Sequence, residues 1–305
     1  MSKRDFLSIT DLSPQEVAGI IQRAGKLKSG IQDKPLTGKS IAMLFEKPSL
    51  RTKVSFDIAV HQMGGHPIYM GRDEVGLGGR ESISDVARVI SRYVDIVVAR
   101  TYSHQTLEEL AAYASVPVVN ALSDVEHPCQ ALGDMLTINE HMTKLAGLRI
   151  AYIGDGNNVA ASLALATASV GASCVIATPP GYELPSEVVR RAEALAVGSA
   201  AAIEQVTRPE EAVEGADVVY TDVWVSMGQE AETEKRLKEF QGYQVSPSLM
   251  EHAKPGAIFM HPLPAHRGEE VSENMLDYPQ SVVFDQAENR LHAQKAILEL
   301  LVRPD

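Results

Sequence analysis

SIAMLFEKPSLRTK (residues 40–53) joins an apolar run to a polar turn and then to a segment whose apolar residues recur at helical spacing. This order predicts a buried strand, a tight connection and a helix that begins near Ser49. The first N–H groups of a helix lack intrahelical acceptors, and Ser49, Arg51 and Thr52 add further donors. The stretch therefore predicts a site for a phosphate or a carboxylate. Taken alone, it is equally compatible with an ordinary capped helix whose Arg51 lies in solvent.

The composition limits the class of protein. The chain has 305 residues, enough for two domains, and a net charge of −12 with no basic stripe, which argues against nucleic acid as a partner. The sequence has no signal-type segment and no apolar run of membrane-spanning length, and its two cysteines, Cys129 and Cys174, form no CxxC pair. We expect a soluble cytoplasmic protein with neither nucleic-acid nor membrane partners.

Short runs rich in Val, Ile and Ala alternate with helix-length segments along the chain. This alternation predicts an α/β protein with two domains, each a parallel β-sheet flanked by helices. The expected strands are residues 40–45, 67–70, 95–99, 116–119, 149–153, 173–177, 217–221, 257–260 and 282–284.

The domain boundary is expected near residue 145, after a long helix around residues 131–143 and at the turn Ala146-Gly147. Residues 1–145 would form the first domain and residues 146–286 the second. A C-terminal helix over residues 287–301, within the segment 287–305, would pack back on the first domain.

Ligands of parallel α/β sheets bind at the carboxyl ends of the strands, so the residues there are candidates for a site. In the first half these are Ser49, Arg51, Thr52, Arg100, Asn120, His127 and Gln130, and in the second half Asn158, Asp222, Ser226, Met227 and His261. Cations and hydroxyls in the first half suit a phosphate, whereas a carboxylate and an amide in the second suit an ammonium group. Arg100 as one member of a surface ion pair and His127 as a structural residue at a helix entry are the competing interpretations.

The segment Gly154-Asp-Gly-Asn-Asn158 follows a strand and raises the alternative of a nicotinamide-dependent oxidoreductase. Val159 stands where the dinucleotide fingerprint needs its third glycine, and the next strand ends in Thr178-Pro-Pro rather than an acidic residue. We therefore expect a Rossmann-like domain without bound NAD, and no cofactor. His261 and His266 flank prolines with no nearby cysteine, so we also expect no metal site.

Six motifs stand in the order found in carbamoyltransferases. They are Ser49-Leu-Arg-Thr-Lys53, His127-Pro-Cys-Gln130, Gly154-Asp-Gly-Asn-Asn158, Asp222-Val-Trp-Val-Ser-Met-Gly228, His261-Pro-Leu-Pro264 and Ala287-Glu-Asn-Arg290. The chain resembles the aspartate/ornithine carbamoyltransferase family over nearly its whole length. The Asp-x-x-x-Ser-Met-Gly segment is similar to that of the ornithine branch.

The resemblance implies transfer of a carbamoyl group from carbamoyl phosphate to the δ-amine of L-ornithine, giving L-citrulline and phosphate, a reaction of arginine biosynthesis. It implies a homo-oligomer, either a homotrimer or a multiple of trimers, in which a loop near Val75–Gly79 reaches a neighbour's site. It implies catalytic roles for Arg51, Arg100, His127 and Asp222. Carbamoyl phosphate would be bound by Ser49, Leu50, Arg51, Thr52, Arg100, His127, Gln130, Pro262, Leu263 and Arg290, and ornithine by Asn158, Asp222, Ser226 and Met227. A cis Leu263–Pro264 bond is also implied.

The chain departs from the family pattern at four positions. Leu50 and Lys53 replace the usual Thr and Arg, and Gly76 replaces a Gln or His. Pro262 stands where the ornithine enzymes usually have Cys, and His-Pro-Leu-Pro is typical of the aspartate enzymes. A carbamoyltransferase acting on aspartate, N-acylated ornithine or putrescine is therefore an alternative, as is a non-catalytic binding protein on the same scaffold.

Overall fold

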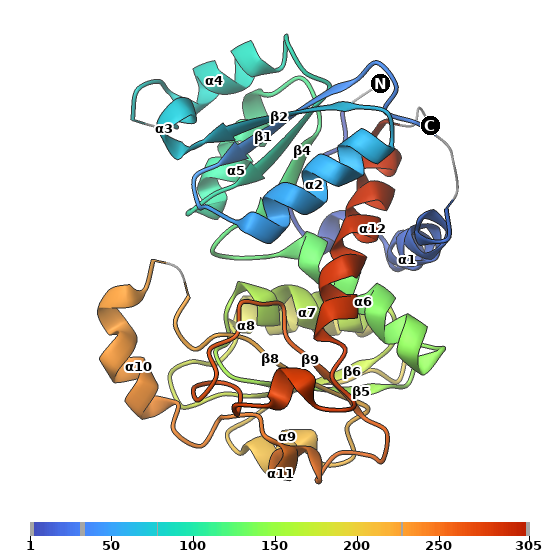
Figure 1. Cartoon of the computed structure of the whole chain (residues 1–305), viewed down its shortest axis with the longest axis vertical. Coiled ribbons are helices and arrows are strands. Elements are labelled where there is room, and N and C mark those ends of the chain that lie inside the picture. The colour runs from blue at the N-terminus through green and yellow to red at the C-terminus, as the bar shows by residue number, and fades with distance from the viewer. Residues whose placement is uncertain (1–2, 31–33, 78, 227, 303–305) are drawn as a thin grey trace. The chain divides into compact units, whose positions relative to one another are not determined.

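The computed structural model describes residues 3–30, 34–77, 79–226 and 228–302. The chain divides into two compact units, the first made of Met1–Leu136 with Glu288–Asp305 and the second of Thr137–Ala287 (Figure 1). Both are α/β units with a parallel sheet flanked by helices, so the predicted fold class is confirmed.

The sheet of the first unit contains four parallel strands in the order β2-β1-β3-β4. These strands are β1 (Ser40–Phe45), β2 (His66–Gly71), β3 (Ile96–Arg100) and β4 (Val118–Leu122). Phe45 at the end of β1 lies in register with Arg100 at the end of β3. The start of the helix after β1 and the Arg100 side chain therefore belong to the same edge of the sheet.

Helices cover both faces of this sheet. They are α1 (Pro14–Lys28), α2 (Leu50–Gln62), α3 (Arg72–Val75), α4 (Ile83–Ile90), α5 (His104–Tyr113), the first part of α6 (Pro128–Met142) and most of α12 (Val283–Val302). Alternate strand residues such as Ala42 and Leu44 form one apolar cluster with α4 and α5. Burying these strands on both faces explains their continuous apolar sequence.

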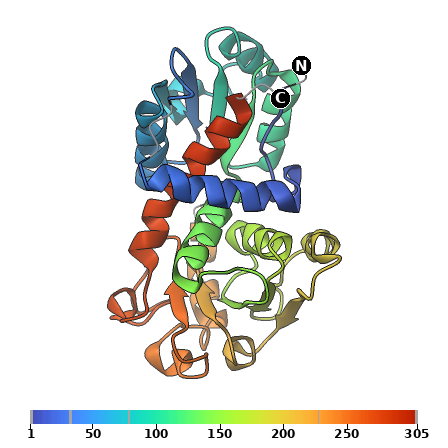
Figure 2. The same cartoon turned by 90° about the vertical axis from the view of Figure 1, so that its right-hand side faces the viewer.

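The C-terminal helix α12 packs on the first unit, as predicted. Figure 2 shows α1 lying across α12. Arg23 Nε donates to Glu299 Oε2 at 2.6 Å, and Lys28 Nζ donates to Asn289 Oδ1 at 2.9 Å. A charged and polar seam thus joins two helices that are more than two hundred residues apart in the sequence.

The second unit contains a five-stranded parallel sheet in the order β7-β6-β5-β8-β9. The strands are β5 (Arg149–Ile153), β6 (Ser173–Ala177), β7 (Ile203–Val206), β8 (Val218–Thr221) and β9 (Ile258–Met260), and the helices include α7 (Asn158–Ser169), α8 (Ser186–Ala196), α9 (Pro209–Val213), α10 (Thr233–Glu239) and α11 (Pro247–Met250). Helix α7 is buried from Val159 to Ser169, because small residues, mostly alanines, allow close packing around its whole circumference.

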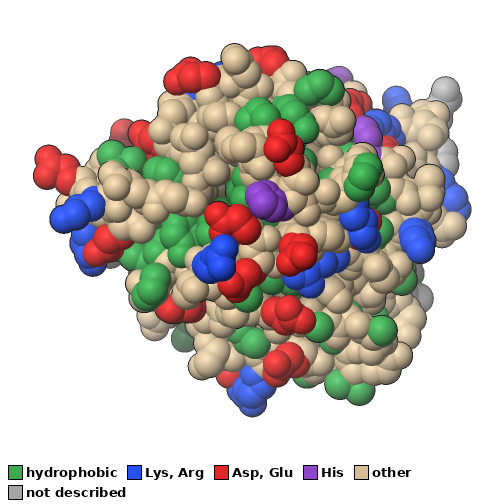
Figure 3. Space-filling view, turned by 90° about the horizontal axis from the view of Figure 1, so that it is seen from below, with side chains coloured by type: hydrophobic (Ala, Val, Ile, Leu, Met, Phe, Trp, Pro, Cys, Tyr) green, Lys and Arg blue, Asp and Glu red, His purple; other side chains and the backbone are tan. Residues whose placement is uncertain are grey.

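One strand prediction was wrong, and one strand was missed. Residues 282–284 are not a strand, because Val283 begins α12, which therefore starts four residues before the predicted helix. The edge strand β7 was missed, because its sequence Ile-Glu-Gln-Val lies only partly buried and lacks an apolar run. No described helix is long and apolar enough to cross a membrane. Figure 3 shows acidic and basic side chains interspersed over the face seen there.

Candidate active site

The connection between β1 and α2 forms the predicted helix N-terminus. Ser49 is the N-cap in an extended conformation, and its side chain accepts a hydrogen bond from the Thr52 backbone N–H at 3.3 Å. Thr52 is buried and Arg51 is half-buried, whereas the Leu50 side chain is 75% exposed. The Leu50 side chain is apolar, so only the backbone N–H of this residue, at the helix start, is suited to an anion.

Two further guanidinium groups reach the same threonine. Arg290 Nη2 donates to Thr52 Oγ1 at 2.6 Å, and Arg100 Nη1 lies 3.5 Å from the same oxygen. Burial, followed by the charges of Arg290 and Arg51, lowers the pKa of Arg100 to about 9. A guanidinium group stays protonated at neutral pH, so this lowered pKa expresses first the cost of burying the Arg100 charge and second its repulsion by Arg290 and Arg51. We call Ser49, Arg51, Thr52, Arg100 and Arg290 the cation cluster.

A close helix contact positions Arg290. A Cβ atom on Gly133 of α6 would lie 3.2 Å from the Arg290 backbone nitrogen and 3.3 Å from its Cα. Glycine therefore allows α12 to approach α6 closely enough for the Arg290 side chain to reach Thr52.

His127 and Gln130 lie at the start of α6, whose first helical residue is Pro128. Burial, reinforced by the charges of Arg290 and Arg100, holds the pKa of His127 well below its ordinary value. The imidazole is therefore neutral at pH 7. Gln130 Nε2 donates to Asp134 Oδ1 at 2.8 Å, which leaves Gln130 Oε1 with no hydrogen-bond partner among the described residues.

Cys129 lies between these residues but is not a nucleophile. Its thiol donates to the Asn120 carbonyl at 3.4 Å, and burial raises its pKa to about 12. The thiolate needed for nucleophilic attack is therefore absent at physiological pH.

In the second unit, the connection between β5 and α7 donates a hydrogen bond to the Asp222 carboxylate. Asn157 Oδ1 accepts hydrogen bonds from the N–H groups of Val159 at 2.9 Å and Ala160 at 3.1 Å, and its Nδ2 donates to Asp222 Oδ2 at 2.9 Å. Asp222 is buried, which raises its pKa, while His261 and Asn157 oppose the rise. A buried carboxylate of this kind would be stabilised by a cationic ligand.

The glycines of the segment that resembled a dinucleotide fingerprint have a packing role. A Cβ atom on Gly156 would lie 2.6 Å from backbone atoms of Tyr182, Glu183 and Leu184. Asp155 forms a buried ion pair with Arg236 at 2.7 Å. The segment thus allows two loops to meet and caps α7.

The His261-Pro-Leu-Pro264 segment is held by hydrogen bonds to its histidine. The Leu263 N–H donates to His261 Nδ1 at 2.9 Å, so the imidazole proton lies on Nε2, which is 3.2 Å from Glu270 Oε1. Pro262 is buried, and the predicted cis Leu263–Pro264 bond is confirmed. His266, Glu269 and Glu270 lie close enough to share a metal ion. Glu270 Oε1 accepts from His261 and the His266 N–H, whereas Glu270 Oε2 has no hydrogen-bond partner among the described residues.

The predicted site residues divide between the units. The first contains Ser49, Leu50, Arg51, Thr52, Arg100, His127, Gln130 and Arg290, and the second contains Asn158, Asp222, Ser226, Pro262 and Leu263. The Ser226 N–H donates to Gln229 Oε1 at 3.1 Å, and Met227 lies outside the described residues. Our sequence analysis missed Asn157, which contacts Asp222, although an asparagine just before an expected helix was a capping signal. It also missed Lys47, which is buried in the turn before Ser49.

Fold and side chains together define a two-unit α/β protein with clustered guanidinium groups at a helix start in one unit and a buried carboxylate at a strand end in the other. A family model described as the aspartate/ornithine carbamoyltransferase carbamoyl-P binding domain matches residues 4–140, and that of the Asp/Orn binding domain matches residues 146–301. The chain therefore belongs to the aspartate/ornithine carbamoyltransferase family.

Individual relatives are similar over nearly their whole length. An ornithine carbamoyltransferase from Pyrococcus abyssi is 52% identical over 98% of this chain and 96% of its own. The solved structure of ornithine carbamoyltransferase from Pyrococcus furiosus is 50% identical, with a TM-score of 0.94 over 97% of this chain and 96% of that chain. An N-acetyl-L-ornithine transcarbamylase structure is 30% identical, with a TM-score of 0.88 over 97% and 99%.

Proposed function

We propose that this protein is an ornithine carbamoyltransferase, which transfers the carbamoyl group of carbamoyl phosphate to the δ-amine of L-ornithine and releases L-citrulline and phosphate. The observation that carries the proposal is the cation cluster, in which Arg100 and Arg290 meet at Thr52 beside the N-terminus of α2. Mutually repelling guanidinium groups at a helix start are stabilised by a dianion such as the phosphate of carbamoyl phosphate.

The first unit binds carbamoyl phosphate in this proposal. Ser49, the Leu50 N–H, Arg51 and Thr52 hold the phosphate, with charge from Arg100 and Arg290. Neutral His127 donates a hydrogen bond to the carbamoyl oxygen, and the unpartnered Gln130 Oε1 accepts from the carbamoyl amide. The backbone carbonyls of Pro262 and Leu263, from the second unit, accept from the same amide.

The second unit binds ornithine. Asp222 pairs with the α-ammonium group, and Asn158, Ser226 and Met227 contact the α-amino and carboxylate groups. The neutral δ-amine attacks the carbamoyl carbon, the carbon–oxygen bond to phosphate breaks, and the departing phosphate takes the proton that the amine loses. Fixed donors and cations stabilise both the oxyanion on the carbonyl and the charge on phosphate, so the proposed catalysis is positioning and electrostatics.

Ornithine is favoured over other acceptors by the sequence of the Asp222-Val-Trp-Val-Ser-Met-Gly228 segment and by relatives at 50–52% identity that carry the name ornithine carbamoyltransferase. One of these, from Pyrococcus furiosus, is named anabolic, which supports a role in arginine biosynthesis. We further propose a homotrimer, with Val75–Gly79 reaching a neighbouring site. The two buried free cysteines support a reducing, cytoplasmic location.

A colorimetric citrulline assay with carbamoyl phosphate and four separate acceptors tests the proposal. The expected result is turnover with L-ornithine and little with N-acetylornithine, putrescine or aspartate. Efficient carbamoylation of aspartate with no use of ornithine would contradict it. That result would mean that Pro262, which is typical of the aspartate enzymes, indicates the acceptor correctly. Binding of carbamoyl phosphate without turnover of any acceptor would instead indicate a non-catalytic binding protein.

A further inference from the structure

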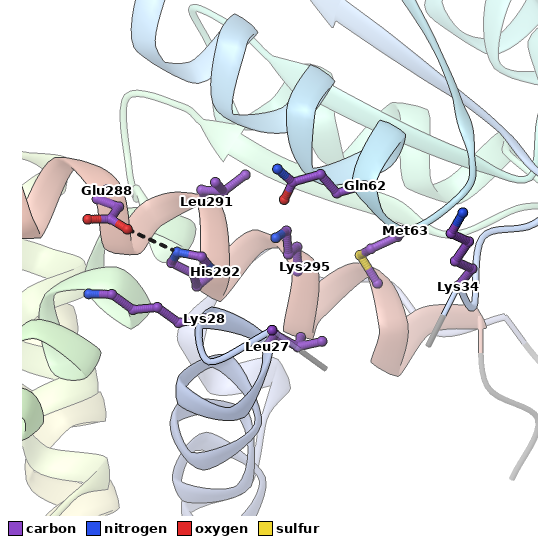
Figure 4. Close-up of a pocket in the computed structure, with 10 residues that line it drawn as sticks. Leu27, Lys28, Lys34, Gln62, Met63, Glu288, Leu291, His292 and Lys295 are labelled. Atoms are coloured by element: carbon purple, nitrogen blue, oxygen red, sulfur yellow. Dashed lines mark hydrogen bonds and ion pairs between the residues drawn. The ribbon is translucent and has the colours of Figure 1, made fainter. Parts of the chain in front are cut away.

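The first unit contains a polar cavity whose side chains are not those of the cation cluster. Its volume is about 650 Å³, a size typical of small-molecule sites, and its lining includes Leu27, Lys28, Lys34, Gln62, Met63, Glu288, Leu291, His292 and Lys295 (Figure 4). Three lysines line it, and Glu288, the one carboxylate among the lining residues, lies 3.5 Å from His292 Nε2.

Lys295 is the central side chain of this cavity. It is only 7% exposed, and no carboxylate or hydrogen-bond acceptor among the described residues pairs with it. Burial lowers the pKa of Lys295, and burial together with the Lys295 charge lowers the pKa of His292. A largely buried lysine without a counterion is costly, and an anion that enters the cavity from solution would reduce that cost.

The cavity is distinct from the cation cluster although the same helices contribute to both. Glu288, Leu291, His292 and Lys295 recur at intervals of three and four residues and so share one face of α12. Arg290 lies off that face and reaches Thr52 instead. Likewise Gln62 and Met63 lie at the C-terminal end of α2, whereas Ser49 and Arg51 lie at its N-terminal end.

We propose that this cavity binds a small phosphomonoester, whose phosphate contacts Lys295 and whose apolar part contacts Leu27, Met63 and Leu291. Lysines are strong point-charge partners for phosphate. Free phosphate would occupy the same charged end but would leave the apolar side chains uncovered. A ligand carrying both groups therefore uses more of the cavity.

Isothermal titration calorimetry with inorganic phosphate and with phenyl phosphate tests the proposal. The proteins are the wild type, Lys295→Met, Arg51→Ala and the control Lys26→Met, whose lysine is exposed on α1 and outside the cavity. We expect two binding events in the wild type and in Lys26→Met. Arg51→Ala should keep the cavity event, and Lys295→Met should weaken it by about 10- to 100-fold. Phenyl phosphate should bind the cavity more tightly than phosphate does.

Thermal unfolding provides an independent measurement. Lys295→Met removes an unpartnered buried ammonium group, so we expect its unfolding midpoint without ligand to be at least that of the wild type, and its midpoint to rise less with phenyl phosphate. Two unchanged events in Lys295→Met, or a single wild-type event that Arg51→Ala abolishes, would overturn the proposal. Because the cavity lining and the cation cluster share no residue, two unchanged events in Arg51→Ala would instead contradict the proposed role of Arg51.

Discussion

The N-termini of α2 and α7 show how one structural element is adapted to opposite charges. Each helix follows an interior strand of a parallel sheet and begins with a capping side chain. Ser49 accepts from one N–H group and has cations around it, whereas Asn157 accepts from two and directs its amide to Asp222. The two helix starts therefore differ in the charge of the side chains around them, and the strand–helix connection is common to both.

The largest effect is expected at the anion-binding side of this comparison. Arg51→Ala should lower kcat/KM by about two to three orders of magnitude, because a charge-assisted contact to phosphate contributes roughly 2–4 kcal/mol in the transition state. Steady-state citrulline kinetics measures this. The matched control is Lys53→Ala on the same helix, whose ammonium lies 3.7 Å from the centroid of the Tyr69 ring and which should retain nearly full activity. Equal losses of kcat/KM in the two variants would show that Arg51 does not contact the phosphate.

Arg100→Met separates function from stability. Its kcat/KM should fall by about 10- to 100-fold, the loss expected for a hydrogen bond to a charged group. The same change relieves repulsion by Arg290 and Arg51, so the unfolding midpoint of the ligand-free protein should rise. Calorimetry of unfolding checks this second outcome. A lower midpoint would show that Arg100 stabilises the fold and is not crowded.

Most of the strands could be predicted from sequence, because buried parallel strands are continuous apolar runs. The run Val282-Val-Phe284 was wrongly predicted as a strand, since three apolar residues fit a strand and a helix start equally well. Of the cation cluster, Ser49, Arg51, Thr52 and Arg100 could be predicted from the strand ends, whereas Arg290 followed only from the family resemblance. Arg290 and Thr52 are 238 positions apart, and the close approach of α12 to Gly133 helps to bring them together. The family motif indicated Asn158, but the hydrogen bond to Asp222 comes from Asn157 and depends on cap geometry.

Pro262→Cys tests the proposed ornithine-binding unit, with a smaller expected effect on the kinetics. A thiol restored there would help to position the incoming amine. Its contribution should equal about one hydrogen bond, which corresponds to a roughly 2- to 12-fold lower KM for ornithine or a higher kcat by the same factor at neutral pH. Aspartate should remain a poor acceptor. A gain in aspartate turnover in this variant would contradict the assignment of acceptor choice to the Asp222–Ser226 segment.

The smallest expected effect is a pH dependence of stability from His127. Its pKa is lowered in the folded protein, so below the ordinary value of 6.5 the unfolded chain binds a proton that the folded protein does not. The stability contribution is complete above that value and is lost as the pH falls toward the folded pKa, by at most about 1.4 kcal/mol per pH unit. The free energy of unfolding, measured with denaturant at pH 7 and at pH 5, should therefore change less with pH in His127→Gln than in the wild type. An identical pH dependence in the two proteins would mean that His127 titrates normally.

The central claim is that the two units bind different ligands, carbamoyl phosphate through the cation cluster and ornithine through Asp222. The direct test is calorimetric titration of carbamoyl phosphate into Asp222→Asn, followed by citrulline kinetics, with Asp285→Asn as the control for an exposed carboxylate of the second unit. The account predicts that Asp222→Asn binds carbamoyl phosphate with nearly the wild-type Kd while KM for ornithine rises by about 10- to 100-fold. Equal loss of both ligands in Asp222→Asn would contradict the division between the units.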